Sequence, residues 1–409
     1  MSRKQTGALK HKWTAFWKGL WARFKKTRLG ALAVRYPAPF IAGGVILLAG
    51  LAALIAALCL GGGAELPEPT PSPEPEPTAT AAPTPRPTPS PEPKTAEFPN
   101  PLTGLELGSR ELMTLRPISV MHNNNRGAMP LLGVSQADIL YETLIEGGYT
   151  RIMGLYQNID DVPLLGAVRS ARTCYLETSL AYDAVLVHCG ASYLAEKEFK
   201  KWKFDHIDGM ALPEKYFWRD KDRRAAGYSL EHTLVSNGGL CRELFNQQER
   251  TEREEAHIAA GPQFTLEPDL PGGAPARDVT VTFSGIKTTG FAYRPDAGLY
   301  AVHQYGEAMK DGAPGGAPVE VTNLIVIQTG ISEIGNKQGH MAIDLQSGGG
   351  GWYATGGRVI PIRWSRDGLR APFAYTRQDG SPLRLACGRS YVCIVPMGRL
   401  PEFEAQPEA

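Results

Sequence analysis

A long apolar run near the N-terminus most limits what this chain can fold into. Residues 40 to 60 are 21 consecutive positions without a charged side chain. A helix of that length, at ~1.5 Å per residue, matches the roughly 30 Å hydrocarbon core of a bilayer. The run therefore predicts one transmembrane helix, placed over residues 39–60. A cleaved signal peptide is the alternative, although its apolar core is usually only about 7 to 15 residues long.

Charges are segregated around this run. Basic residues crowd positions 3 to 35, and no Asp or Glu precedes Glu65, although the whole chain has a formal net charge of only +1. Positive charge beside an apolar span favours a cytoplasmic location for that side. We therefore expect residues 1–38 to form a basic cytoplasmic segment and everything after the run to be extracellular. The predicted location is the cell membrane, in a single-pass topology.

A cysteine near the end of the apolar run suggests a second kind of membrane attachment. A lipoprotein carries a cysteine to be lipidated at such a place, directly after a small residue. Here the bulky Leu58 precedes Cys59, so a retained helix is the favoured anchor and lipidation stays open.

Proline dominates residues 61–99 and occupies nearly every second position in much of this tract. Such a composition cannot build a core and favours polyproline II, so we expect a disordered linker. At ~3.1 Å per residue the linker could reach on the order of 100 Å, enough to cross a cell-wall layer. A Pro-rich ligand for a partner domain is the alternative.

The first folded region is predicted over residues 100–255. Strand patterns over 117–123, 149–158 and 184–190 alternate with helix patterns over 135–148, 169–183 and 191–202. The helix over 135–148 depends on Ser135 and Asp138 in capping-box spacing and on a Gly147–Gly148 stop. This alternation predicts an α/β domain with a mixed sheet.

The second region, residues 272–400, has a different pattern. Short alternating segments separated by Gly, Asp-Gly and Pro predict a smaller, mostly β domain. The glycine runs 348–351 and 356–357 are expected to be hairpin turns, because neither has the lysine of a P-loop. Three aromatic residues are expected to pack in the core rather than to form a sugar-binding surface: Trp352, Tyr353 and Trp364.

Two arginines, Arg169 and Arg172, flank a Ser-Ala pair in the segment "VRSAR", directly before or within the start of a predicted helix. Cations at the N-terminal turn oppose the helix dipole, so the pair suggests a bound anion. An internal carboxylate is an equal alternative, for which three residues are candidates: Glu142, Glu146 and Asp183.

Two further stretches add polar groups to the predicted edge of the sheet. His188 closes the strand over 184–190, and the charged loop over 217–233 follows later in the same region. Such a loop is often only solvated. The other interpretation is a ligand-binding site for an anionic or carbohydrate ligand, made of Arg169, Arg172, His188, Arg219, Asp220 and His232. The pattern assigns no catalytic residue.

The cysteines and histidines show no metal-ligand spacing, and no cofactor motif is legible. We therefore expect no metal and no cofactor. Cys387 and Cys393 flank an apparent turn and could pair, although their distances from that turn are unequal. Nucleic acid is not an expected partner, because the part after the apolar run has no basic stripe.

Five runs carry a resemblance to a known family: "NPLTGLELGS", "RPISVMHNN", "ADILYETLIEGGYTRIMGLYQ", "LGAVRSARTCYLETSLAYDAVLVHCGAS" and "FWRDKDRRAAGYSLEHTLVS". The chain from Asn100 to about Gly398 resembles the YerB-like family of bacterial extracytoplasmic lipoproteins. The resemblance implies an envelope protein with an N-terminal and a C-terminal domain, and it brings no established catalytic residues. The chain departs from the family at Leu58–Cys59 and at residues 230–233, where members tend to have a Pro-His-Asn run.

Together these features predict a membrane-anchored envelope protein that binds an anionic or carbohydrate component, such as a cell-wall polymer. The rival hypothesis is a hydrolase or transferase acting on cell-wall polymers, with His188 or His232 as general base and the arginines as a clamp. A third hypothesis is an assembly factor that contacts an envelope protein.

Overall fold

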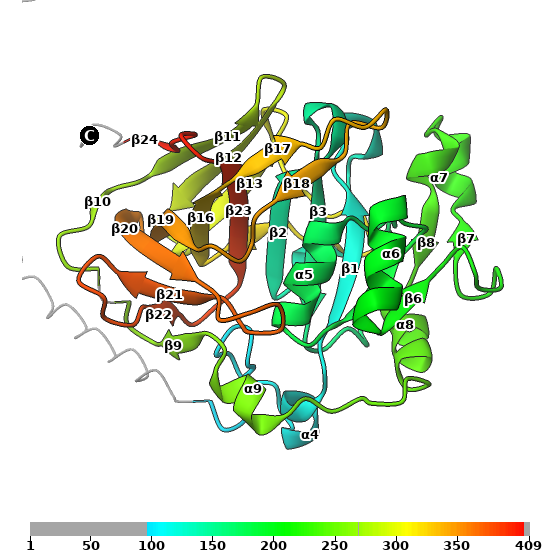
Figure 1. The fold of residues 1–409 in the computed structure, drawn as a ribbon, viewed down its shortest axis with the longest axis horizontal. Coiled ribbons are helices and arrows are strands. Elements are labelled where there is room, and N and C mark those ends of the chain that lie inside the picture. Colours follow the sequence, from blue (N-terminus) through cyan, green and yellow to red (C-terminus); the bar gives the residue numbers. More distant parts are fainter. Residues whose placement is uncertain (1–95, 269, 405–409) are drawn as a thin grey trace, which may run out of the picture. The chain divides into compact units, whose positions relative to one another are not determined.

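The computed structural model describes residues 96–268 and 270–404 (Figure 1). The predicted cytoplasmic segment, the predicted transmembrane helix over 39–60 and all but the end of the predicted linker lie outside these residues. Among the residues described, no helix is both long and apolar enough to cross a membrane.

A mixed sheet takes strands from both halves of the described chain. β2 pairs in parallel with β23, with Leu140 opposite Tyr391, and β23 pairs in parallel with β16. The strand order is β10-β20-β19-β16-β23-β2-β3-β1-β5-β6, with β21 beside β20. The strands are β1 (Ile118–Asn123), β2 (Ile139–Leu144), β3 (Thr150–Tyr156), β5 (Val185–His188), β6 (His206–Asp208), β10 (Ala274–Pro275), β16 (Asn323–Thr329), β19 (Gly349–Thr355), β20 (Arg358–Ser365), β21 (Ala374–Arg377) and β23 (Ser390–Pro396).

A second, antiparallel sheet packs against one face of this main sheet. Buried and more exposed residues alternate along β11 and β13, as expected when only one face of a sheet is covered. The covered face contributes Val281, Phe291 and Val302 to a core shared with Val120 and Val185 of the main sheet. The strands are β11 (Asp278–Ser284), β12 (Lys287–Arg294), β13 (Leu299–Gln304), β14 (Glu307–Ala308), β15 (Glu320–Val321) and β24 (Glu402–Glu404).

Two short helices cover the other face of the main sheet (Figure 1). Leu176 of α5 and Phe199 of α6 pack in one core with Met121 of β1 and Leu186 of β5. The α-helices are α4 (Arg110–Thr114), α5 (Thr173–Ala181), α6 (Tyr193–Trp202), α7 (Lys221–Ala225), α8 (Gly238–Phe245) and α9 (Glu255–Ala259).

Short elements complete the described structure. Three small sheets pair β17 (Ile331–Glu333) with β18 (Met341–Ile343), β9 (Gln263–Thr265) with β22 (Arg384–Ala386), and β8 (Leu234–Ser236) with both β4 (Leu165–Gly166) and β7 (Trp218–Arg219). Single 3-10 turns are η1 (Arg126–Ala128), η2 (Val134–Gln136), η3 (Glu146–Gly148) and η4 (Leu230–His232).

The fold class predicted from the sequence is wrong for the N-terminal half, because the helix expected over 135–148 is the central strand β2 between two 3-10 turns. The residues that resembled a helix cap have other partners. Ser135 donates from its N and Oγ to the Asp311 carboxylate, both at 2.8 Å, and Asp138 accepts from Asn100 and the Gln157 amide. Both halves are thus β-rich with mixed pairing, although the expected β1, β3, α5, β5 and α6 are confirmed.

The glycine run of the C-terminal half is also different from the prediction. Gly349, Gly350 and Gly351 lie inside β19 rather than in a turn, while Gly356–Gly357 form the expected turn between β19 and β20. Tyr353 and Trp364 are buried in the core, at 0 % and 2 % exposure. Among the described cysteines, Cys387 and Cys393 are both free thiols rather than a pair.

Candidate anion-binding site

One edge of the main sheet gathers the carboxyl ends of several strands. β1, β5 and β6 run parallel, and β3 runs antiparallel to β1, so that Asn123 at the end of β1 lies opposite Arg151 near the start of β3. β2 runs in the same direction as β1 and is followed by Glu146. Loops at such an edge commonly hold ligands, because polar backbone groups and loop side chains converge there.

The "VRSAR" segment crosses this edge as an extended bridge. The Arg169 amide donates to the Met121 carbonyl at 3.0 Å, and the Arg169 carbonyl accepts from the Cys189 amide at 3.0 Å. Two residues later, the Ala171 amide donates to the Gly190 carbonyl at 3.0 Å. The segment is therefore fixed across the ends of β1 and β5, with its two arginines at the edge rather than inside α5.

Arg172 has an internal carboxylate partner. It precedes the first residue of α5, and its Nε and Nη2 donate to the two carboxylate oxygens of Glu146 at 2.5 and 3.0 Å. Glu146 is one of the three carboxylates considered as an internal partner. Burial raises the pKa of Glu146, but the Arg172 guanidinium outweighs burial, so that the pKa lies below its usual value. Nη1 of Arg172 also donates to the Ser170 and Ala171 carbonyls.

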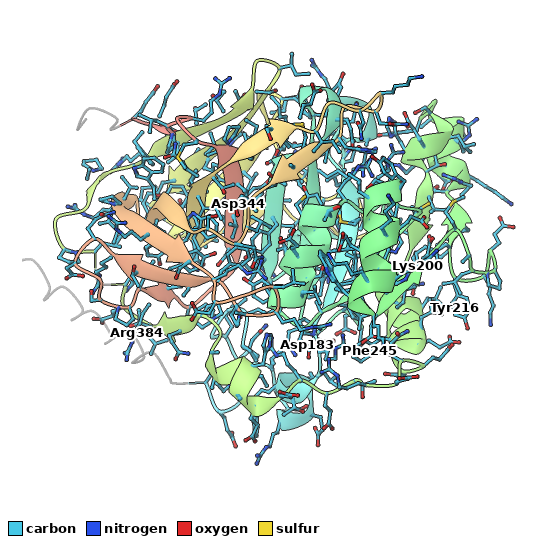
Figure 2. All side chains as sticks on the ribbon, in the orientation of Figure 1. Asp183, Lys200, Tyr216, Phe245, Asp344 and Arg384 are labelled. Carbon is cyan, nitrogen blue, oxygen red and sulfur yellow. The ribbon has the colours of Figure 1, made fainter. Side chains whose placement is uncertain are left out.

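Asp183, another of those carboxylates, lies at the opposite edge. It follows α5 and precedes β5, and Figure 2 shows it low in the molecule, near the amino ends of these strands. Its carboxylate lies 3.4 Å from Arg116 and also pairs with Arg250. It is therefore unable to neutralise either arginine of the "VRSAR" segment.

Arg151 supplies a third guanidinium beside the two predicted arginines. Its side chain comes from β3, the residue is only 4 % exposed, and its Nη1 donates to the Ser170 carbonyl. Its buried Nε has no hydrogen-bond partner among the described protein atoms. Burial, with the charges of Arg172 and Arg169, lowers the pKa of Arg151 to about 9. Arg151 therefore stays charged at neutral pH in a cationic environment.

Arg169 lies on the outer side of this cluster. Its Nη1 donates to the Glu231 carbonyl at 3.0 Å and to the Glu231 carboxylate at 3.2 Å. The Glu231 side chain is 57 % exposed, so this pair is well solvated and weak. Nε of Arg169 is buried and, like that of Arg151, has no hydrogen-bond partner among the described protein atoms. We call Arg151, Arg169 and Arg172 the arginine cluster.

Two predicted residues lie close to the arginine cluster. His232, 7 % exposed, follows Glu231 and makes a 2.8 Å hydrogen bond between Nδ1 and the Asn123 side chain. Burial lowers its pKa, and the Arg169 charge acts in the same direction. Arg219 donates to the Leu230 carbonyl at 2.7 Å. Burial raises the pKa of the Cys189 thiol, and the charges of Arg219 and Arg169 act against this rise.

The other two predicted residues have structural partners within the protein. His188 is 1 % exposed, and both ring nitrogens are engaged, with the Gly190 carbonyl at 2.8 Å and with His206 at 2.9 Å. Its ring stacks on Phe199 of α6 at a centroid distance of 5.0 Å. Asp220 is the N-cap of α7, and its carboxylate accepts hydrogen bonds from the backbone amides of Asp222 and Arg223.

Arg151 and Glu231 were not among the residues selected from the sequence. Arg151 stands in "YTRIMGLY", where a single charge interrupts an otherwise apolar strand. A charge within a central strand is rarely buried without a partner, and this signal could have marked the position. Glu231 offered no such signal, because it is one of many charges in an exposed loop. No group of three or more His, Cys, Asp or Glu residues in the described chain is arranged to hold a metal ion.

Two family models match the chain, one after the other. Residues 102–249 match the N-terminal domain, and residues 279–392 the C-terminal domain, of "Protein of unknown function (DUF3048)". The chain belongs to the DUF3048 family. The arginine cluster lies wholly within the part that matches the N-terminal domain of this family.

A curated relative and a solved structure agree with this assignment. The chain is 28% identical over 302 residues, which is 72% of this chain and 86% of the relative, to the protein of Bacillus subtilis (strain 168) named "Putative lipoprotein YerB". The crystal structure of the YerB protein from Bacillus subtilis superposes with a TM-score of 0.65 at 25% identity, covering 76% of this chain and all of that one. The fold described above is therefore similar to that of this solved structure.

Proposed function

We propose that this DUF3048 protein binds an anionic component of the cell envelope at the arginine cluster. The observation that carries the proposal is Arg151, a nearly buried cation with two further guanidinium groups close enough to lower its pKa. Its one hydrogen-bond acceptor among the described residues is the Ser170 carbonyl. A guanidinium in such a place gains most from a carboxylate or phosphate, which satisfies its donors and its charge together.

The charge balance of the cluster supports an anion in particular. Three guanidinium groups face two carboxylates, and one of these carboxylates, Glu146, is already held by both oxygens on Arg172. The other, on Glu231, is mostly exposed and contacts only one nitrogen of Arg169. Nε of Arg151 and Nε of Arg169 are left as donors without acceptors. An unmet buried donor typically costs about 1 to 3 kcal/mol.

The proposed location in the envelope is inferred from the name of the Bacillus subtilis relative. The Bacillus subtilis relative carries the name of a lipoprotein, and lipoproteins are attached to a membrane on its outer side. A ligand in that compartment would come from the anionic polymers or the peptidoglycan of the envelope. Both carry the phosphate or carboxylate groups that a guanidinium binds.

Recognition without catalysis has more support than an enzymatic role. The rival hypothesis needs His188 or His232 as a general base that meets a ligand. His188 uses both ring nitrogens inside the protein, and the Nδ1 of His232 is held by Asn123. A general base must lie within hydrogen-bond distance of the proton that it abstracts. This requirement favours neither histidine as a catalytic base.

The test is binding of the full-length chain to purified peptidoglycan and to poly(glycerol phosphate), measured by sedimentation and calorimetry. Arg169→Ala removes the outer guanidinium and is expected to weaken binding at least tenfold. Arg151→Lys keeps the charge but loses the planar donor set, and should weaken binding as well. Binding should also weaken as salt is raised, since the interaction is between opposite charges.

Arg294→Ala is the matched control. It removes one positive charge from β12, where Arg294 pairs with Asp296 and Glu320 at the surface, away from the cluster. This variant should bind as the wild type does. Equal binding by the wild type and Arg169→Ala, or an equal loss in Arg294→Ala, would remove the arginine cluster from the function.

A further inference from the structure

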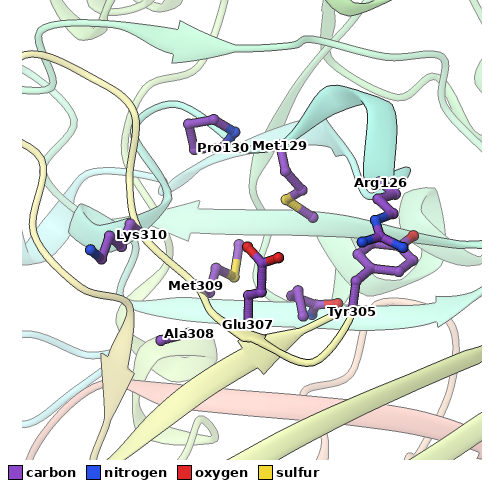
Figure 3. Close-up of a pocket in the computed structure, with 9 residues that line it drawn as sticks. Arg126, Met129, Pro130, Tyr305, Glu307, Ala308, Met309 and Lys310 are labelled. Carbon is purple, nitrogen blue, oxygen red and sulfur yellow. The ribbon is translucent and has the colours of Figure 1, made fainter. Parts of the chain in front are cut away.

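A cavity of about 670 Å³ lies between the two halves of the described chain, apart from the arginine cluster. One wall is the turn η1 with Met129 and Pro130 after it, and the other wall is the hairpin of β13 and β14 with Met309 and Lys310 after it (Figure 3). The volume falls within the roughly 300 to 1,000 Å³ range of small-molecule sites, and such sites are common where two parts of a fold meet.

The middle of the cavity is apolar and adaptable. Figure 3 shows Met129 and Met309 facing the space from opposite walls, with Pro130 and Ala308 beside them. Thioether side chains are flexible and polarisable, and they fit apolar ligands of irregular shape. The aromatic ring of Tyr305 adds a flat surface at one end. These residues suit an alkyl or aryl body rather than a sugar.

Cations stand at both ends of this apolar space. In Figure 3, Arg126 lies beside Tyr305 at one end and Lys310 lies at the other, with Glu307 between them. Within the described chain neither cation lies within ion-pair distance of a carboxylate, and Glu307 is the one acidic residue that lines the cavity. The lining therefore carries a net positive charge and is complementary to a ligand with one anionic group.

The floor of the cavity is rigid and preorganised. Gln304, 4 % exposed, donates from Nε2 to the Tyr391 hydroxyl at 3.1 Å, and Tyr305 donates from its hydroxyl to the Asn124 carbonyl at 2.5 Å. These bonds tie the C-terminal hairpin to β23 and to Asn124, which follows β1. A site whose walls are held in place loses little entropy when a ligand binds.

We propose that this cavity is a second binding site, for a small amphipathic anion with an alkyl or aryl body and a single phosphate or carboxylate. The apolar body lies between Met129 and Met309, and the anionic group pairs with Arg126 or Lys310. The site does not depend on the arginine cluster, because no residue of the cluster lines the cavity.

The test uses octyl phosphate, octanoate and octylammonium below their micellar concentrations, titrated into the full-length chain labelled with ¹³C at the methionine methyl groups. Octyl phosphate and octanoate are expected to shift the Met129 and Met309 methyl resonances. Octylammonium has the same alkyl chain with the opposite charge and should bind at least tenfold more weakly. Resonances are assigned with Met129→Leu and Met309→Leu.

Two variants separate the cavity from unspecific binding. Ala308→Trp adds a bulky side chain at an exposed position that lines the cavity, and it should weaken octyl phosphate binding at least tenfold without disturbing the core. Ala374→Trp makes the same change at an exposed position of β21, and should bind as the wild type does. The Arg126→Ala/Lys310→Ala double variant should lose the preference for octyl phosphate over octylammonium.

Three results would overturn the inference. These are unshifted Met129 and Met309 methyl resonances, octylammonium binding as tight as octyl phosphate binding, and an unchanged affinity in Ala308→Trp. Arg169→Ala separates this inference from the proposed function: it should leave octyl phosphate binding at the cavity unchanged even where polymer binding is lost. Loss of both in Arg169→Ala would show a single site and would also overturn the inference.

Discussion

The Lys287 ammonium lies 3.0 Å from the Glu142 carboxylate in a fully buried ion pair, with side chains that are 1 % and 0 % exposed. Glu142 belongs to β2 in the N-terminal half and Lys287 to β12 in the C-terminal half. The carboxylate oxygens also accept hydrogen bonds from five neutral side chains of both halves: Asn124, Thr150, Thr289, Gln304 and Tyr391. The pair therefore joins two chain segments that match separate family models.

Removing one partner of this pair is expected to be strongly destabilising. Glu142→Gln leaves the Lys287 ammonium buried without a counter-charge, and such losses cost roughly 3 to 5 kcal/mol of unfolding free energy. Urea unfolding at neutral pH, followed by tyrosine and tryptophan fluorescence, measures the change. The Glu142→Gln/Lys287→Met double variant has no buried charge and should recover much of the loss. A single variant as stable as the wild type would contradict the prediction.

The close packing of β19 against β16 predicts different effects for two neighbouring glycines. A Cβ on Gly351 would lie 2.4 Å from the Val326 carbonyl oxygen, whereas a Cβ on Gly350 would meet nothing within 4 Å. Gly351→Ala must displace one of two paired strands and should lower the unfolding free energy by about 1 to 3 kcal/mol or more. Gly350→Ala, the matched control, should be near neutral or slightly stabilising. Equal urea midpoints for the two variants would contradict this argument.

The sequence predicts local elements better than it predicts the sheet. Strands with apolar patterns at 118–123, 150–156 and 185–188 were found, and each is buried along its whole length. Residues 139–144 were missed, because Ser135, Asp138 and the Gly147–Gly148 pair looked like helix boundaries around an apolar run that also fits a buried strand. The pairing of β2 with β23 joins positions about 250 residues apart, and no local pattern encodes it.

The candidate site, like the fold, could be predicted from the sequence only in part. The sequence indicated Arg169 and Arg172 because of their spacing, but the partner of Arg172 is Glu146, which follows a different strand. Whether a loop arginine meets a carboxylate depends on which strand ends share an edge, so the sequence left both alternatives open. Arg151 joins the cluster only because β3 runs antiparallel to β1.

The described cysteines should differ widely in reactivity. Cys174, Cys241 and Cys393 are buried, and burial raises the pKa of Cys174 to about 12 and that of Cys241 to about 11. Cys189 and Cys387 are partly exposed. In a Cys59→Ala background, a thiol-reactive disulfide reagent at pH 8 should label about two thiols before unfolding and about five after it. Cys387→Ser should remove one of the two early labels. Early labelling of Cys393 would contradict its burial.

His188 should make the protein less stable in mild acid. Burial lowers its pKa from 6.5 to about 4, while the Asp208 charge acts against burial and His206 acts with it. Between about pH 6.5 and pH 4 the unfolded chain binds a proton at this residue and the folded chain does not. The unfolding free energy is therefore at its full value above pH 6.5 and falls as the pH decreases through this window.

His188→Gln tests this contribution. A shift of this size corresponds to roughly 3 kcal/mol between the two ends of the window. Glutamine can still donate toward the Gly190 carbonyl but loses the stacking on Phe199, so the variant should be less stable than the wild type at pH 7.5. Glutamine also cannot take up a proton. The difference between the two unfolding free energies should then shrink as the pH approaches 4.5. Urea unfolding at intervals of half a pH unit measures both curves, and parallel curves would mean that His188 titrates alike in the folded and unfolded chain.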